Sequence, residues 1–251
     1  SWHRSTAEAP ERMKIERAVL REVPLALARP FVSSAGTVSE RHVLILTLHA
    51  EGLAGWSECV APDTPHYTYE TTATAWHVLT EHVLPSAVGL GFEEPAEVLS
   101  AAAHVRGHPM AKATLEMAAW DLVARSRGRP LSDVLGGSRP VVDVGVSLGM
   151  MPIVELVETV ERHLADGYSR VKVKIGPGRD GAVLEPLRER FPDLTLWADA
   201  NSAYTLEDAP RLEALDALEL GMLEEPLAPG ALVDYARLQE RLATPVSYTH
   251  L

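Results

Sequence analysis

The sequence is poor in cysteine, in aromatic residues and in basic residues. Cys59 is the only cysteine, so no disulfide can form within the chain, and a reducing cytoplasm is the expected location. Only 6% of the residues are aromatic, and 35 acidic residues outnumber 23 basic ones, which gives a formal net charge of −12. No apolar run approaches the roughly 20 residues of a membrane-spanning helix. These features argue against nucleic acid and membranes as partners and favour a small molecule.

The remaining composition is that of a globular protein. Of the 251 residues, 46% are hydrophobic and 23% are charged, which suits either one large α/β domain or two domains of ordinary size. Residues 1–12 are polar and lack the apolar segment of a signal peptide, whereas Met13 begins an apolar stretch and resembles a natural start. We therefore expect residues 1–12 to be a disordered or read-through tail.

The pattern over residues 13–137 predicts an α+β domain. Strand-like stretches cover residues 15–23 and 42–49, and a loop is expected at residues 29–36. A later helix is predicted from apolar residues at helical spacing, namely Met110, Leu115, Ala118, Ala119 and Leu122. Strands followed by helices are typical of the α+β class.

The pattern changes over residues 138–251, where short apolar strands alternate with amphipathic helices. The expected strands cover residues 142–148, 170–175, 194–198 and 220–223, and a further strand begins at residue 245. This alternation predicts a βα repeat around a parallel sheet.

Polar residues follow the strands at a regular interval. Lys174, Asp199 and Glu224 are each 25 residues apart, and Ser147 lies one slightly longer step earlier. In a (β/α)₈ barrel successive strands are neighbours, so such residues converge on one mouth, whereas in a doubly wound sheet successive strands need not be adjacent. The interval therefore favours a barrel and predicts a further functional group at position 249.

Two lysines lie on one of these strands. Lys172 and Lys174 are two residues apart, so their side chains point to the same face, here the barrel interior. Burial and mutual repulsion would lower the pKa of each lysine, which suits one of them to act as a base near neutral pH. The alternative is a solvated edge strand with alternating lysines.

Two carboxylates end the next strands. Asp199 and Glu224 would form an oxygen-ligand pair suited to a hard cation, with Mg²⁺ as the natural candidate and Mn²⁺ as an alternative. Asn201 and Ser202 could cap a helix as readily as bind a ligand. Two lysines beside a cation site, without a redox-cofactor motif, indicate abstraction of a proton next to a carboxylate, with the metal stabilising an enediolate.

Ordered motifs give the chain a family resemblance. The sequences KVK at residues 172–174, DAN at 199–201 and EEP at 224–226 resemble the muconate-lactonising branch of the enolase superfamily. Longer segments resemble o-succinylbenzoate synthases that also racemise N-acylamino acids: residues 28–36, 55–60, 110–117, 145–150 and 199–210. The likeness runs from Met13 to about Val246.

The resemblance implies a fold and a reaction. The first domain would cap an incomplete TIM-type barrel, Lys174 would transfer the proton with support from Lys172, and Asp199 and Glu224 would bind magnesium. The implied reaction is the dehydration of 2-succinyl-6-hydroxy-2,4-cyclohexadiene-1-carboxylate to o-succinylbenzoate, a step of menaquinone synthesis. The full-length protein would be a homo-oligomer.

The resemblance also implies substrate contacts. Ser147 would lie near the succinyl or acyl end of the ligand, and Asn201 is a further candidate. Phe31, on a mobile loop, and Tyr67, on a second segment, would close over the substrate. For Phe31 and Tyr67 taken alone, ordinary core packing is the alternative.

The end of the sequence departs from the family. Where the family has a segment that reads like PICLDES, with the third metal ligand, this chain has PVSYTHL at residues 245–251, which places Thr249 at the acidic position. His250 is a poor substitute because imidazole suits softer cations. The second lysine of the family would lie beyond Leu251. We expect the last five residues to be foreign sequence and the natural protein to be longer.

Two rival functions remain at this point. The first is N-acylamino acid racemisation or dipeptide epimerisation, which needs two opposed lysines. The second is a non-catalytic fragment without a complete metal site.

Overall fold

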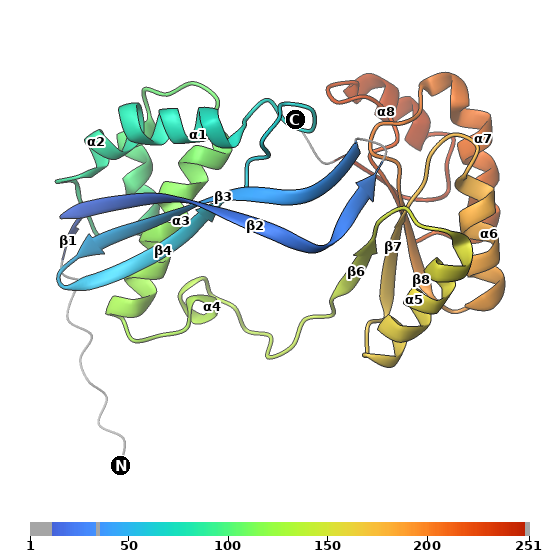
Figure 1. The fold of residues 1–251 in the computed structure, drawn as a ribbon, viewed down its shortest axis with the longest axis horizontal. Helices are drawn as coiled ribbons and strands as arrows, with labels where there is room; N and C mark the ends of the chain where they lie inside the picture. Colours follow the sequence, from blue (N-terminus) through green and yellow to red (C-terminus); the bar gives the residue numbers. More distant parts are fainter. Residues whose placement is uncertain (1–11, 34–35, 249–251) are drawn as a thin grey trace, which may run out of the picture. The chain divides into compact units, whose positions relative to one another are not determined.

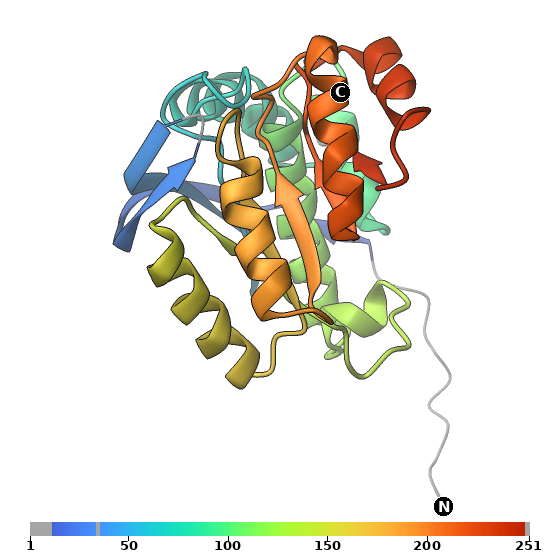
Figure 2. The same cartoon turned by 90° about the vertical axis from the view of Figure 1, so that its right-hand side faces the viewer.

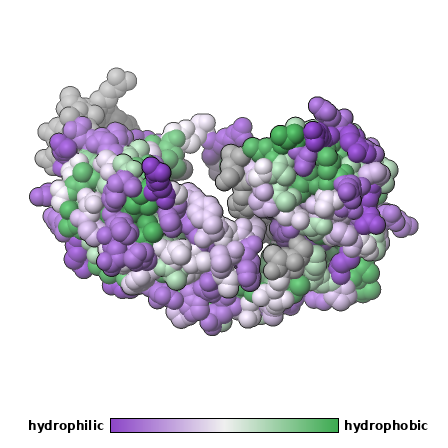
Figure 3. Space-filling model, turned by 90° about the horizontal axis from the view of Figure 1, so that it is seen from above, coloured by the Kyte–Doolittle hydropathy of each residue, from purple (hydrophilic) through white to green (hydrophobic). Residues whose placement is uncertain are grey.

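The computed structural model describes residues 12–33 and 36–248 and divides into two compact units (Figure 1). We call the described residues within 1–28 and 40–139 the capping unit, and those within 29–39 and 140–251 the barrel unit. Among the described residues, no helix is long and apolar enough to cross a membrane. On the face drawn in Figure 3, hydrophilic residues interrupt the hydrophobic ones over both units.

The capping unit contains two antiparallel sheets. The short strands β1 (Met13–Lys14) and β5 (Gly91–Phe92) pair with each other, and β2 (Arg17–Ser33), β3 (Gly36–Ala50) and β4 (Leu53–Cys59) form a three-stranded sheet in that order. Glu51 and Gly52, both with positive φ, connect β3 to β4. Two consecutive positive φ values suit a tight hairpin turn whose twist matches that of the strands.

The strand β2 corrects one prediction. Residues 29–36 were expected to form a loop, but β2 continues to Ser33 and β3 begins at Gly36. Pro24 and Pro30 interrupt the strand pattern in the sequence, and β2 tolerates them because it lies at the edge of its sheet, where a missing N–H group need not break a ladder.

The capping unit also contains helices, of which α3 packs on strand β4 of this sheet. They are α1 (Thr72–Val78), the π-helical turn η1 (Leu79–Val83), α2 (Leu84–Ala87), the 3₁₀ helix η2 (Pro95–Ala102), α3 (Pro109–Ser126) and α4 (Leu131–Val134). Alternate residues of β3 and apolar residues of α3 are fully buried in one core: Leu44, Leu46, Leu48, Leu115, Ala118 and Leu122. The helix predicted around residues 110–122 is confirmed.

Helix α3 begins with an unusual cap. His108, at the N-cap position, has a φ of 52° and makes no side-chain capping bond. Instead, the buried carboxylate of Glu70 accepts hydrogen bonds from the backbone N–H groups of Met110 at 2.7 Å and Ala111 at 3.1 Å. A carboxylate at a helix N-terminus is stabilised both by these free N–H groups and by the helix dipole.

The barrel unit is built on one parallel sheet. Its strands are β6 (Gly145–Leu148), β7 (Arg170–Lys174), β8 (Thr195–Asp199), β9 (Met222–Glu224) and β10 (Val246–Ser247), and each pairs with the next in sequence. A doubly wound sheet reverses its strand order at a switch point, whereas a barrel does not. The predicted fold class, an α+β capping domain followed by a partial barrel, is therefore confirmed.

Helices cover the outer face of this sheet (Figures 1 and 2). They are α5 (Ile153–Ala165), α6 (Asp180–Arg190), α7 (Ala209–Ala214) and α8 (Leu232–Gln239), with 3₁₀ turns η3 (Leu206–Asp208) and η4 (Leu215–Leu218) on either side of α7. The core joins alternate strand residues such as Val171, Val173 and Leu196 to helix residues such as Leu184 and Leu187. Residues in between on the same strands are left to face the barrel interior.

Gly55 provides a test of the packing in the capping unit. A Cβ atom at this position would lie 2.3 Å from the backbone oxygen of Ala118 and 2.7 Å from the Cβ of Leu122. Because both neighbours belong to the body of α3, we expect Gly55→Ala to lower the free energy of unfolding by about 1–3 kcal/mol. Urea unfolding followed by circular dichroism measures this loss.

The matched control is Gly91→Ala in β5. A Cβ atom there would meet the Nε of Arg12 at 2.9 Å, and this flexible side chain can move aside. We expect a much smaller loss for this variant. Equal unfolding midpoints for Gly55→Ala and the unsubstituted chain would contradict the close packing of β4 on α3.

Candidate active site

Strand register brings the predicted polar residues to one edge of the parallel sheet. Lys174 lies opposite Asp199, and Asp199 lies opposite Glu224. Ser147 lies opposite Lys172, two residues before Lys174. The interval of 25 residues therefore corresponds to the step from one strand to its neighbour, both from β7 to β8 and from β8 to β9. From β9 to β10 the step is shorter, because Ser247 lies opposite Glu224, and position 249 falls outside the described residues.

The two lysines and the two carboxylates form one ionic network. Lys174 Nζ donates to Asp199 Oδ2 at 2.6 Å and to Asn201 Oδ1 at 2.8 Å. Lys172 Nζ donates to Glu224 Oε2 at 2.7 Å and lies 3.2 Å from the same oxygen of Asp199. Asp199 and Lys174 are only 2% and 8% exposed. Both lysines thus lie in the barrel interior rather than on a solvated edge strand.

The backbone around these residues is held in sparsely populated conformations. Asn201, Ser202 and Glu225 all have positive φ, of 44°, 60° and 47°. Residues other than glycine adopt such values at a cost, and they persist where the surrounding structure fixes them, often at functional sites. Here the N–H of Asn201 donates to Asp199 Oδ1 at 3.1 Å, and the N–H of Ser202 donates to the carbonyl of Glu225 at 2.7 Å.

The charge environment of Lys172 differs from the prediction. Burial lowers its pKa, but the hydrogen bond to Glu224 and the charge of Asp199 outweigh burial, so the pKa is raised above its ordinary value of 10.5. The prediction that lysine–lysine repulsion lowers the pKa of this residue is wrong for this arrangement. Lys172 Nζ lies 2.7 Å from Glu224 Oε2 and 3.2 Å from Asp199 Oδ2, and opposite charges this close stabilise its charged form.

Phe31 lies at the lysine site within the barrel unit. Its ring centre is 5.8 Å from Lys174 Nζ, a distance at which a cation is attracted by an aromatic face. The adjacent Val32 accepts a hydrogen bond through its carbonyl from the N–H of Met150 at 2.9 Å. A Cβ atom on Gly149 would lie 3.1 Å from that carbonyl oxygen, so the small residue permits the close approach.

The other predicted substrate contacts are placed less closely. Ser147 is exposed on β6. Tyr67 is 46% exposed, in the capping unit segment between β4 and α1.

Thr249 and His250, at the position of the family's third metal ligand, lie outside the described residues. The sequence favours Glu224 well above Glu225 as a ligand, yet Glu225 is 3% exposed and directly follows Glu224.

Two candidate ligands of the predicted cation site lie within the described residues. Asp199 and Glu224 offer carboxylate oxygens at adjacent strand ends, the donor type that a hard cation prefers. No group of three histidine, cysteine, aspartate or glutamate residues suited to a metal ion is found in residues 12–33 and 36–248. The donors present fit two ligands of a magnesium site.

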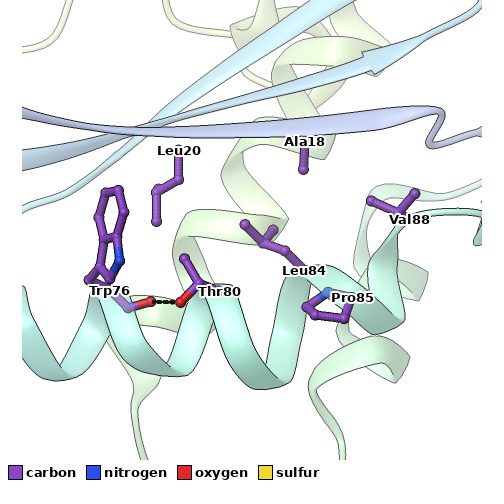
Figure 4. Close-up of a pocket in the computed structure, with 7 residues that line it drawn as sticks. All are labelled: Ala18, Leu20, Trp76, Thr80, Leu84, Pro85 and Val88. Carbon is purple, nitrogen blue, oxygen red and sulfur yellow. Dashed lines mark hydrogen bonds between the residues drawn. The ribbon is translucent and has the colours of Figure 1, made fainter.

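A separate groove lies in the capping unit (Figure 4). It has a volume of about 320 Å³ and is lined by Ala18, Leu20, Trp76, Thr80, Leu84, Pro85 and Val88. The Thr80 hydroxyl already donates to the carbonyl of Trp76 at 2.9 Å. Since none of the lining residues is charged or titratable near neutral pH, the groove offers no acid, base or metal ligand.

Comparison with known protein families agrees with this architecture. Residues 15–136 match the N-terminal domain of the mandelate racemase / muconate lactonizing enzyme family, and residues 155–249 match the enolase C-terminal domain-like family. Together these matches cover most of the chain. The chain belongs to the enolase superfamily, in its mandelate racemase and muconate lactonizing enzyme branch.

Individual relatives show which members of the superfamily the chain is similar to. The chain is 46% identical to the o-succinylbenzoate synthase of Geobacillus kaustophilus and 49% identical to the N-succinylamino acid racemase of Thermus thermophilus, over 93% of its own length. It spans only 63% and 64% of those two proteins. A crystal structure of the dipeptide epimerase from Enterococcus faecalis, complexed with Mg and a dipeptide, aligns with a TM-score of 0.85 at 25% identity, covering 94% of this chain and 68% of that one.

The raised pKa of Lys172 can be tested directly. Because its folded pKa exceeds the ordinary value of 10.5, Lys172 contributes stability below that pH, and this contribution is lost as the pH rises through the folded pKa. We expect the midpoint of the Lys172 side-chain transition, followed by an NMR titration without added divalent cations, to lie above pH 10.5. Glu224→Gln removes the strongest raising interaction and should shift the transition to lower pH. A transition below 10.5 in the unsubstituted chain would contradict the ionic network.

Proposed function

We propose that the protein is an o-succinylbenzoate synthase. The proposed reaction is the magnesium-dependent syn-dehydration of 2-succinyl-6-hydroxy-2,4-cyclohexadiene-1-carboxylate to o-succinylbenzoate. The observation that carries the proposal is the convergence of Lys172, Lys174, Asp199 and Glu224 at one sheet edge, with contacts of 2.6 to 3.2 Å. This set combines a proton-transferring amine with hard-cation ligands, the chemistry needed to remove a proton next to a carboxylate.

Lys174 is the proposed base. It is buried, it is fixed by Asp199 and Asn201, and Phe31 covers it on one side. In its charged form it cannot accept a proton, so the proposed base is the neutral amine. Lys172 is the proposed supporting cation, placed to hold a negatively charged group of the substrate.

Asp199 and Glu224 are the proposed magnesium ligands. When bound, magnesium would supply positive charge to the substrate carboxylate as the neighbouring proton is removed. Ser147, Phe31, Tyr67 and Asn201 are proposed to contact the substrate. Of these, Asn201 lies in the ionic network itself, through its amide oxygen.

A second candidate reaction is racemisation of N-succinylamino acids. The likeness to the Thermus thermophilus racemase, at 49% identity, supports it as well as the likeness to the synthase supports the first candidate. Both reactions begin with proton abstraction next to a carboxylate, so the network of Lys174 and Asp199 serves either one. The two reactions differ in the next step, which is loss of water in the synthase and return of a proton to the opposite face in the racemase. The choice between them therefore depends on groups on the opposite side of the substrate.

Lys174→Ala tests the proposed base in a polypeptide that contains this chain and spans the full length of its relatives. We expect the rate of o-succinylbenzoate formation to fall by about 10²- to 10⁴-fold, the usual contribution of general base catalysis. The product is followed by its ultraviolet absorbance, and N-succinylamino acid racemisation is followed by polarimetry. Thermal unfolding checks that the variant is folded.

Lys14→Ala, an exposed lysine of the capping unit, is the matched control and should keep full activity. Full activity in Lys174→Ala would remove the proposed role of that residue. A full-length protein that racemises N-succinylamino acids but leaves the cyclohexadiene acid unchanged would replace the synthase assignment by the second candidate.

A further inference from the structure

Tyr204 connects three consecutive strand-end loops of the barrel unit. It lies in the loop that follows β8, and its backbone N–H donates to the carbonyl of Pro226, in the loop after β9, at 3.0 Å. Its hydroxyl donates to Asp180 Oδ2, at the start of α6 after β7, at 3.1 Å. These three strands carry Lys174, Asp199 and Glu224.

We propose that Tyr204 is a positioning residue, whose hydroxyl and backbone together fix the relative positions of the loops that follow the lysine strand and the two carboxylate strands. The kinetic consequence of this role rests on the proposed function, whereas the structural consequence does not.

The burial of Tyr204 and Asp180 supports the importance of the hydrogen bond between them. Tyr204 and Asp180 are 2% and 8% exposed, so neither polar group can exchange its partner for bulk water. A buried carboxylate that loses a hydrogen bond keeps its desolvation cost. Arg211 is a charged group near Asp180, but its Nε lies 3.9 Å away and its side chain is half exposed. The phenol is a closer and buried donor, and its pKa is raised by burial and by the charge of Asp180, which keeps it protonated.

The segment that Tyr204 holds is the one with unfavourable backbone angles. Asn201 and Ser202 have positive φ and lie three and two residues before Tyr204, and Glu225 has positive φ next to Pro226. The N–H of Ala200 donates to the carbonyl of Glu224 at 2.9 Å, and the N–H of Ala203 donates to the carbonyl of Ala200 at 3.1 Å. Conformations of this kind relax unless their ends are held. Tyr204 supplies a tether at the end of this segment.

Tyr235 offers a matched comparison in the same unit. Its hydroxyl is also hydrogen-bonded, to the carbonyl and the N–H of Leu227, and its side chain is also buried. Leu227 belongs to the connection that leads directly into α8, the helix that carries Tyr235. Tyr235→Phe thus removes a buried hydroxyl without removing a link to the loop after β7.

The first experiment measures amide hydrogen exchange by NMR in Tyr204→Phe, Asp180→Asn and Tyr235→Phe. We expect the amides of Ala200 and Ser202 to exchange about tenfold or more faster in Tyr204→Phe, because local opening no longer breaks the bond to Asp180. Asp180→Asn keeps an acceptor oxygen and should give a smaller increase. Asp180→Asn should add little to Tyr204→Phe in the double variant, since both remove one contact. Tyr235→Phe should leave both amides at their original rates.

The second experiment measures kinetics and magnesium affinity in the full-length protein. Substitution of a residue that orients metal ligands typically costs about 10- to 100-fold in metal affinity or activity, and we expect a loss of this size in Tyr204→Phe and not in Tyr235→Phe. We expect the loss to fall on kcat and on magnesium affinity, with the KM of the organic substrate little changed. Thermal unfolding should show similar destabilisation of the two phenylalanine variants.

The possible results separate the two proposals. Unchanged exchange at Ala200 and Ser202 in Tyr204→Phe, or equal effects of Tyr204→Phe and Tyr235→Phe on exchange, would overturn the positioning role. Faster exchange confined to Tyr204→Phe and Asp180→Asn, in a full-length protein without synthase or racemase activity, would support the positioning role and reject the proposed function.

Discussion

The buried carboxylate of Asp199 is the constraint on which the candidate active site depends. One of its oxygens lies within 2.6 Å of Lys174 Nζ and 3.2 Å of Lys172 Nζ, at a residue that is 2% exposed. A buried ion pair gains little net stability, because desolvation of the charges offsets much of their attraction. Burial of two ammonium groups around one carboxylate costs still more free energy, unless a second carboxylate also pairs with one of them, as Glu224 does with Lys172. The stability of the fold therefore gives little reason for such a network, and this supports the proposed reactive site.

The parallel sheet makes this network possible because two of its properties, strand register and side-chain alternation, fix the position of each residue. Register sets Lys174, Asp199 and Glu224 side by side across three strands, while alternation sends their neighbours Val173, Ala198 and Leu223 into the helix-covered core. The apolar residues stabilise the sheet, and the sheet in turn fixes the charged residues to within hydrogen-bonding distance. Loops then refine the arrangement, at the cost of positive φ angles at Asn201, Ser202 and Glu225.

The sequence predicts the sheet better than the loops and better than the electrostatics. Periodicity of apolar residues and the spacing from Lys174 to Glu224 are enough to predict a parallel, sequentially ordered sheet. The end of β2 was missed because Pro24 and Pro30 look like strand breakers unless the strand is known to lie at an edge. The raised pKa of Lys172 was missed because two nearby lysines are visible in the sequence, whereas the distances to their carboxylates are not. No sequence pattern connects Tyr204 to Asp180, which are 24 residues apart.

The charges of the site constrain the ligands that would suit it. With both lysines protonated, the charges of the four side chains in the network, Lys172, Lys174, Asp199 and Glu224, sum to zero. A divalent cation alone would add two positive charges to a poorly solvated region, which is unfavourable without added negative charge. A substrate with two carboxylates would restore the balance, and both the cyclohexadiene acid and an N-succinylamino acid have two. The third acid, which the family has at the position of Thr249, and the second lysine, which the resemblance places after Leu251, would cancel each other. Charge balance is thus in line with the dicarboxylate substrates of the two proposed reactions, and the choice between them must come from the shape of the site and from groups opposite Lys174.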